Sequence, residues 1–244
     1  MSDPYFRSYD KDVAESEDPL DFRQNDPMLP QHPARIVICS GSGGGKTTVV
    51  LNLMFNNPSL NYDNVIIIAK QVMEDKWQYV VNRLRKEAKI IQQVTGEDMS
   101  DYVQTYTSVD EAPSIQELEE DKGRQTLIII DDMCNEKNQE KLKDIYIGGR
   151  KTNSTSIYLT HKYTSTPILL RGQVNYFFFL DDNLETDLDY TARQLATDID
   201  KDTFKRLYKE CMKKEHGMFV VDKKAKREDK HLRYRCGLHT LFKY

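Results

Sequence analysis

The sequence predicts an α/β fold in which a mostly parallel sheet is flanked by helices and followed by a C-terminal β-hairpin extension. Three observations predict it. Short apolar runs that are continuous rather than alternating recur along the chain, as expected of strands covered on both faces. Charged stretches with helical periodicity lie between these runs. A glycine-rich turn directly after the first run leads from a strand into a helix.

The expected elements follow one another along the chain. Strands are expected at 35–39, 64–69, 126–130, 156–160 and 176–180, with a further strand at 103–106. Helices are expected at 46–55, 74–93, 136–146, 187–195 and 203–212, and Trp77 lies on the apolar face of the second of these. Two late apolar runs, 218–221 and 232–236, flank the basic loop 223–230 and predict the hairpin.

Composition divides the chain into three parts. Residues 1–34 form an acidic arm punctuated by proline, residues 35–200 form the α/β core, and residues 201–244 form a basic segment packed on the core. With 39% apolar and 30% charged residues, the composition is that of a globular domain and not of a disordered chain. A net charge of −4 argues against a protein that only coats nucleic acid. The basic segment suits either a polyanion or ordinary solvent exposure.

The sequence predicts neither a membrane-spanning segment nor a signal peptide. Its longest apolar runs have the length of a strand, far below the roughly 20 residues that a spanning helix needs. The N-terminus lacks the basic start and apolar stretch of a signal peptide, so an intracellular protein is expected. Four widely spaced cysteines, Cys39, Cys134, Cys211 and Cys236, are expected to be reduced and mostly buried and not to ligate metal.

The glycine-rich turn carries a phosphate-binding sequence. It reads Ser40-Gly41-Ser42-Gly43-Gly44-Gly45-Lys46-Thr47, and Thr48 continues into the expected helix. Backbone N–H groups of such a turn surround a triphosphate, Lys46 reaches the β and γ phosphates, and the Thr47 hydroxyl ligates Mg²⁺. The pattern departs only at Ser40, where glycine is expected. The turn therefore predicts a P-loop NTPase, and ATP is favoured because no guanine-reading Asn-Lys-x-Asp sequence is present.

Two carboxylates follow the apolar run 126–130. Ligands bind at the carboxyl edge of open α/β sheets, so Asp131 is expected to complete the Mg²⁺ shell begun by Thr47. Asp132 is expected to orient or deprotonate the water that attacks the γ-phosphate. The alternative is a pair of solvated aspartates that begins a loop. A second carboxylate favours an ASCE-type, RecA-like P-loop ATPase core, which has an additional strand between the P-loop strand and the acidic strand.

The run 156–160 is expected to be that additional strand. It ends in Thr160 and His161, whose side chains would then point at the γ-phosphate. His161 is expected to donate a hydrogen bond and so to sense whether the phosphate is present. The alternative is a solvent-facing histidine in a loop.

Several blocks later in the chain are more specific than the P-loop. They are Gly148-Gly149-Arg150, Asn153-Ser154, Ile157-Tyr158-Leu159-Thr160-His161-Lys162-Tyr163, Leu170-Arg171, Tyr176-Phe177-Phe178-Phe179-Leu180, Gly217-Met218-Phe219-Val220-Val221-Asp222 and Leu232-Arg233-Tyr234-Arg235. These blocks resemble the genome-packaging ATPases of large eukaryotic DNA viruses and virophages, within the FtsK/HerA superfamily. The chain departs from the resemblance at His161, where the family commonly has Gln, and at Asp132, where relatives in the wider superfamily have Glu.

The resemblance implies a ring, hexameric or pentameric, that hydrolyses ATP at its subunit interfaces and translocates double-stranded DNA into a preformed capsid. Arg150 matches an arginine that the family has ahead of the strand corresponding to 156–160. It is expected to act in trans on the γ-phosphate bound by the neighbouring subunit, with Arg171 as the alternative. Capsid or portal proteins are expected partners. The expected location is the host cytoplasm or viral factory, with association with the virion as a further expectation.

The remaining functional expectations stay open between alternatives. Basic residues of the C-terminal segment are expected to contact either the DNA backbone or the capsid portal; they include Lys223, Lys224, Lys226 and Arg227. An alternative function is an ATP-dependent switch or scaffold that recruits capsid or replication proteins without moving DNA. Another alternative is a small-molecule kinase, whose product would be a phosphorylated metabolite and not free phosphate.

Overall fold

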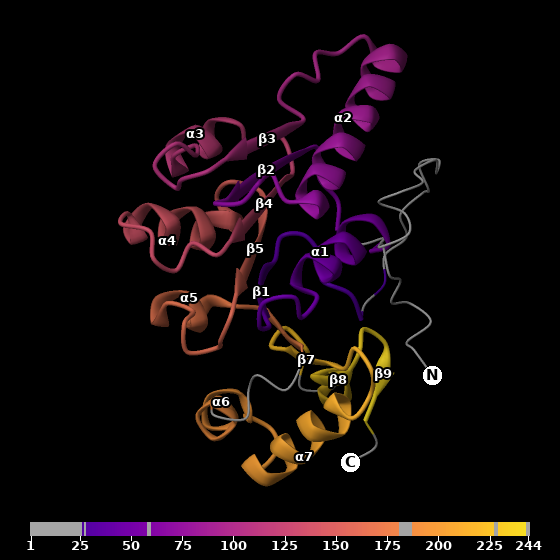
Figure 1. Ribbon diagram of the computed structural model, residues 1–244, viewed down its shortest axis with the longest axis vertical. Coiled ribbons are helices and arrows are strands. Elements are labelled where there is room, and N and C mark those ends of the chain that lie inside the picture. The colour runs from indigo at the N-terminus through magenta and orange to yellow at the C-terminus, as the bar shows by residue number, and fades with distance from the viewer. Residues whose placement is uncertain (1–25, 27, 58–59, 181–186, 227–228, 243–244) are drawn as a thin grey trace.

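The computed structural model describes residues 26, 28–57, 60–180, 187–226 and 229–242 (Figure 1). Most of the arm 1–34 and Arg227 lie outside the described residues, so the structure does not test what the sequence predicts for them. The side chain of Arg150 is not described either.

One sheet runs through the described part of the chain, with nine strands in the order β3-β2-β4-β5-β1-β6-β7-β8-β9. The strands are β1 (Arg35–Cys39), β2 (Asn64–Ala69), β3 (Val103–Tyr106), β4 (Thr126–Asp131), β5 (Ser154–Thr160), β6 (Tyr176–Leu180), β7 (Met218–Asp222), β8 (Tyr234–Cys236) and β9 (Thr240–Leu241). Pairing is parallel from β3 to β6 and antiparallel from β6 to β9. The predicted mostly parallel sheet and antiparallel C-terminal hairpin are confirmed.

Helices cover both faces of this sheet (Figure 1). They are α1 (Lys46–Phe55), α2 (Asp75–Thr95), α3 (Ile115–Glu120), α4 (Gln139–Ile147), α5 (Ile168–Gln173), α6 (Leu188–Leu195) and α7 (Lys201–Met212), with short 3-10 turns at Gly148–Arg150 and Lys230–Leu232. One apolar core lies under α1 and α2, and a second lies under α3 to α7. This arrangement is the α/β layering expected from the sequence.

The first strand shows why its apolar run is continuous. Ile36 and Ile38 pack into the core under α1 and α2, whereas Val37 and Cys39 pack into the core on the other face. Successive side chains of a strand point to opposite faces, so a strand covered on both sides needs apolar residues at every position. All four of these side chains are buried.

Several element boundaries differ from the sequence predictions by a few residues, and two of these differences have an evident cause. The helix expected at 136–146 begins at Gln139, because the side chain of Asn138 accepts the backbone N–H of Lys141 and caps the helix. The strand expected at 156–160 begins two residues earlier, because Ser154 pairs with Thr126 of β4.

The C-terminal half of the predicted hairpin also differs. Of the run 232–236, only Tyr234–Cys236 is strand, and Lys230–Leu232 forms a 3-10 turn before it. Because β7 pairs with β6, the strands of the basic segment extend the sheet of the core.

The described end of the arm is attached to the core. Leu29 is buried, and the His32 ring lies 2.9 Å from the Thr155 hydroxyl through Nδ1. Asp26 Oδ2 accepts a hydrogen bond from His239 Nε2 at 2.8 Å. These contacts tie the segment that precedes β1 to β5 and to the C-terminal segment.

The expectation that the cysteines are mostly buried and not paired in disulfides is confirmed. All four cysteines are free; Cys39, Cys211 and Cys236 are buried and Cys134 is half-buried. Among the described helices, none combines the length and the apolarity that crossing a bilayer requires.

Candidate active site

The strand order brings the predicted motifs to one edge of the sheet. β5 lies between β1, which leads into the P-loop, and β4, which ends in Asp131. The pairings Cys39 with Thr160 and Asp131 with Leu159 place the carboxyl ends of all three strands at the same level. The additional strand expected between the P-loop strand and the acidic strand is thus present.

The P-loop is closed by its own backbone and by its lysine. Gly43 and Gly45 have φ values of +74° and +96°, which glycine adopts at no steric cost. The N–H of Gly44 donates to the carbonyl of Gly41 at 3.2 Å. Nζ of Lys46 donates to the carbonyls of Ser40 at 2.9 Å and Gly41 at 3.0 Å. The ammonium of Lys46 is therefore hydrogen-bonded to the same turn that is expected to hold the phosphates.

The departure at Ser40 is compatible with this turn. Ser40 is buried, and its N–H donates to the carbonyl of Thr160 at 3.1 Å. Its φ is not positive, unlike those of Gly43 and Gly45. Because the backbone at this position does not need the left-handed region, serine fits where the motif has glycine.

Asp131 lies at the end of β4 and is held by a tryptophan. Nε1 of Trp77, on α2, donates to Oδ2 of Asp131 at 3.0 Å, and Trp77 is fully buried. Burial raises the pKa of Asp131, while the hydrogen bond from Trp77 and the ammonium of Lys46 act to lower it. Lys46 is thus close enough to Asp131 to act on its charge, as a shared phosphate and metal site requires.

The residue before the tryptophan contacts the P-loop helix. Nζ of Lys76 donates to Oγ1 of Thr48 at 3.1 Å. Sequence reasoning missed both contacts, because it assigned Trp77 only to an apolar helix face. One signal was available: a buried indole N–H needs an acceptor. The identity of that acceptor depends on the tertiary fold.

Asp132 and His161 face each other beside Asp131. Nε2 of His161 lies 3.6 Å from Oδ1 of Asp132, and the Cys134 thiol donates to the same oxygen at 3.8 Å. About half of each side chain is exposed, 53% for Asp132 and 41% for His161. Asp132 has a φ of +53°, an uncommon conformation for a residue other than glycine. The two polar groups are therefore open to a ligand at the sheet edge.

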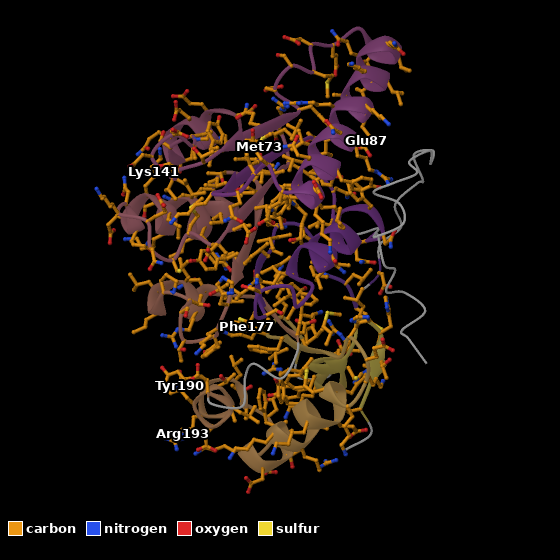
Figure 2. All side chains as sticks on the ribbon, in the orientation of Figure 1. Met73, Glu87, Lys141, Phe177, Tyr190 and Arg193 are labelled. Atoms are coloured by element: carbon orange, nitrogen blue, oxygen red, sulfur yellow. The ribbon has the colours of Figure 1, made fainter. Side chains whose placement is uncertain are left out.

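The two candidate arginines have different surroundings. The guanidinium of Arg171 lies 5.1 Å from the ring centroid of Tyr163 and 5.7 Å from that of Tyr190, and its Nη1 donates to the Tyr190 hydroxyl at 3.3 Å. Figure 2 shows Tyr190 on α6. Arg150 ends the 3-10 turn that precedes β5. A Cβ at Gly149 would lie 2.6 Å from the Ser154 carbonyl oxygen, so glycine is needed for this close approach.

Two of the basic C-terminal residues contact the protein itself. Nζ of Lys224 donates to the carbonyl of Pro33 at 2.9 Å. Nζ of Lys223 lies 6.0 Å from the ring centroid of Phe177, a buried residue of β6 that is labelled in Figure 2. Burial, together with the charges of Arg233 and Arg35, lowers the pKa of Lys223. These two lysines help to attach the C-terminal segment to the core.

The donors at the sheet edge fit a magnesium ion that is bound together with a nucleotide. Thr47 and Asp131 offer a hydroxyl and a carboxylate, and Mg²⁺ prefers oxygen ligands. Within the described residues, no group of three or more His, Cys, Asp or Glu side chains is placed to hold a metal. Mg²⁺ characteristically binds through one or two carboxylates plus substrate phosphates, which matches this small donor set.

The fold and the site together define the protein class. A P-loop strand, an acidic strand, an inserted strand between them and a carboxylate pair at the shared edge are the features of a P-loop NTPase of the additional-strand type. The family model of the poxvirus A32 protein matches residues 21–223, and the chain belongs to that family.

Solved structures of a viral NTPase share this fold. The genome packaging NTPase B204 from Sulfolobus turreted icosahedral virus 2, in complex with AMPPCP, matches with a TM-score of 0.54 and 11% identity, over 84% of this chain and 96% of that chain. Its complex with AMP matches with a TM-score of 0.52 and 12% identity over the same shares of the two chains. B204 from Sulfolobus turreted icosahedral virus, described as a DNA-packaging ATPase, matches with a TM-score of 0.51 and 12% identity, over 84% and 98%.

The comparisons agree with the resemblance seen in the sequence. A comparison with curated protein sequences found no match. Family membership and fold together confirm the resemblance to viral genome-packaging ATPases.

Proposed function

We propose that this protein is an ATP-driven double-stranded DNA translocase that packages a viral genome into a preformed capsid. The A32 family and the fold shared with a viral genome-packaging NTPase support this function. One observation carries the proposal: Lys46, Asp131 and the facing pair Asp132 and His161 lie at one edge of the sheet. The proposed setting is the host cytoplasm or viral factory, with association with the virion.

In the proposed mechanism, the P-loop binds the triphosphate first. Lys46 exchanges the carbonyls of Ser40 and Gly41 for the β and γ phosphates, since a charged acceptor makes the stronger hydrogen bond. Backbone N–H groups of the P-loop, residues 40–48, surround the phosphates at the start of α1. Thr47 and Asp131 would hold Mg²⁺, which when bound offsets the negative charge of the phosphates.

Asp132 and His161 have the remaining roles in the proposed mechanism. Asp132 orients the attacking water and accepts its proton, a role for which its exposed carboxylate is accessible. His161 contacts the γ-phosphate and, being next to Asp132, links the presence of that phosphate to the position of the water. Hydrolysis to ADP and phosphate follows.

Arg150 completes the site from the neighbouring subunit of a hexameric or pentameric ring. We favour it over Arg171, because the guanidinium of Arg171 already contacts Tyr163 and Tyr190 in its own chain. A finger of this kind contributes a factor of about 10³–10⁵ in rate. Mixed rings test the assignment: Arg150→Ala subunits combined with Lys46→Ala subunits should recover turnover that neither variant has alone. Unchanged inactivity of the mixture would contradict a finger acting in trans.

DNA and capsid or portal proteins are the proposed partners. Lys226 and Arg227 are the proposed contacts to the DNA backbone or the portal, since Lys223 and Lys224 contact the core.

Phosphate release in the presence and absence of long duplex DNA tests the function. Wild-type protein should release free phosphate faster with duplex DNA, and Lys46→Ala should lose both basal and stimulated turnover. Lys122→Ala is the matched control and should behave as wild type, because it changes an exposed lysine that precedes β4, at the opposite end of that strand from Asp131. Turnover that ignores DNA would instead favour the switch or scaffold, and a phosphorylated metabolite in place of free phosphate would favour a kinase.

A further inference from the structure

We propose that Trp77 is a positioning residue for the metal-binding carboxylate of Asp131, and that its indole reports when the metal–nucleotide complex is bound. The inference rests on the proposed function and assigns a role to a residue outside the P-loop and the acidic pair. Its basis is the hydrogen bond of 3.0 Å from Nε1 of Trp77 to Oδ2 of Asp131.

The contact fixes which carboxylate oxygen is available. The indole of Trp77 has one N–H donor and no acceptor. Oδ2 of Asp131 is therefore the carboxylate oxygen that this hydrogen bond occupies. The ring of Trp77 is fully buried, which prevents the indole from turning away. We infer that Oδ1 of Asp131 is then the oxygen that would bind the metal. Groups that hold a metal-binding carboxylate in this way set its orientation and tune affinity for the metal.

The same helical turn also contacts α1, the helix whose first turn includes the expected metal ligand Thr47. Lys76 donates to Oγ1 of Thr48, the residue that follows the expected metal ligand Thr47. Two consecutive residues at the start of α2 therefore connect α1 and β4, the two elements that supply the metal-binding oxygens. Through these two contacts, the position of α2 affects the spacing between Thr47 and Asp131.

The chain offers a direct spectroscopic test, because Trp77 is its only tryptophan. Emission of the full-length protein is recorded during titration with a non-hydrolysable ATP analogue, once with Mg²⁺ and once with EDTA. Binding is followed in parallel by calorimetry. The inference predicts a change in tryptophan emission that follows the binding curve with Mg²⁺ and is smaller or absent with EDTA. Binding with Mg²⁺ that leaves the emission unchanged would overturn the inference without any substitution.

A substitution tests the positioning role itself. Trp77→Phe keeps an aromatic ring in the core and removes the N–H donor. We expect the affinity for Mg²⁺ in the presence of the analogue to fall about 10–100-fold, as is usual when a group that orients a metal ligand is lost. Binding of the analogue in EDTA should be unchanged, which a general loss of structure would not allow.

Tyr146→Phe is the matched control. It removes the hydroxyl that donates to the carbonyl of Ile36 at 3.2 Å from another fully buried aromatic residue. It should leave both binding curves as in the wild type. Equal Mg²⁺ dependence in Trp77→Phe and wild type would overturn the inference alone. A wild type that binds no Mg²⁺–analogue complex would overturn the proposed function and this inference together.

Discussion

Nε2 of His161 lies 3.6 Å from Oδ1 of Asp132, so the two positions at which the resemblance to packaging ATPases implies a departure face each other. The resemblance implies a longer carboxylate, Glu, at the position of Asp132 and an amide, Gln, at the position of His161. A shorter carboxylate beside a larger ring occupies similar space, and both groups remain open to a ligand. The two departures are therefore expected to act as one unit.

This relationship predicts non-additive kinetics. Asp132→Glu alone should crowd His161, and His161→Gln alone should leave Asp132 without its neighbour, so each should lower the rate of ATP turnover. The double variant should recover part of that loss, with a coupling free energy of about 0.5–3 kcal/mol, as found for residues in contact. Steady-state phosphate release from the four proteins gives the cycle. Purely additive effects would mean that the two side chains act independently.

Restoring the glycine of the P-loop motif should bring no gain. Ser40 does not use the left-handed backbone region, so Ser40→Gly relieves no strain in the folded protein. The substitution does increase the conformational freedom of the unfolded chain. We expect the free energy of unfolding to fall by about 0.4–1 kcal/mol and nucleotide affinity to stay unchanged. Denaturant unfolding and calorimetry check the two quantities. A clear increase in affinity would show that serine distorts the loop.

The buried ion pair between Asp222 and Arg235 should matter to the stability of the C-terminal hairpin. Nη1 of Arg235 lies 3.2 Å from Oδ2 of Asp222, and their side chains are 0% and 5% exposed. Asp222→Ala leaves the guanidinium buried without this carboxylate, so the free energy of unfolding should fall by about 3–5 kcal/mol. The matched control is Arg193→Ala, at the residue labelled in Figure 2, which breaks the exposed pair with Asp189 on α6 and should cost less than about 1 kcal/mol. Similar losses in both variants would contradict this account.

The pair between Asp101 and Arg124 predicts a pH dependence of stability. Hydrogen bonds from Arg124 hold the pKa of Asp101 below its ordinary value. A lowered carboxyl pKa stabilises the fold above the unfolded value of about 4, and this stabilisation is lost as the pH falls through the folded value. Both side chains are partly exposed, so Asp101→Asn should cost no more than about 1 kcal/mol at neutral pH.

Urea unfolding of wild type and Asp101→Asn between pH 7 and pH 3 checks the sign. The difference in the free energy of unfolding should narrow as the pH decreases. A constant or widening difference would contradict the assigned role of the ion pair.

Elements with strong local patterns could be predicted from the sequence. β2 is apolar after its first residue and buried throughout, so no other element suits it. Lys46 and Asp131 were predictable because each lies in a local motif that joins a strand to a loop. Shorter elements were missed. The helix α3 has six residues and buries only Leu118, although Ser114 and Glu117 form a capping box that the sequence displays.

Contacts between distant segments explain the rest. Trp77 and Asp131 are 54 residues apart, and nothing near either residue identifies the other as its partner. The facing of Asp132 and His161 likewise requires β4 and β5 to pair in a particular register. The motifs identify candidate residues for the chemistry, whereas the fold determines which side chains contact those residues.

The central claim is that the P-loop and the acidic pair bind one Mg²⁺–nucleotide complex. Calorimetric titration with a non-hydrolysable ATP analogue and Mg²⁺ tests it most directly, using wild type, Lys46→Ala, Asp131→Ala and the control Lys122→Ala. The account predicts one binding site in wild type and control, loss of binding in Lys46→Ala, and loss of the Mg²⁺ dependence in Asp131→Ala. No heat of binding in the wild type, or binding that ignores both substitutions, would contradict it.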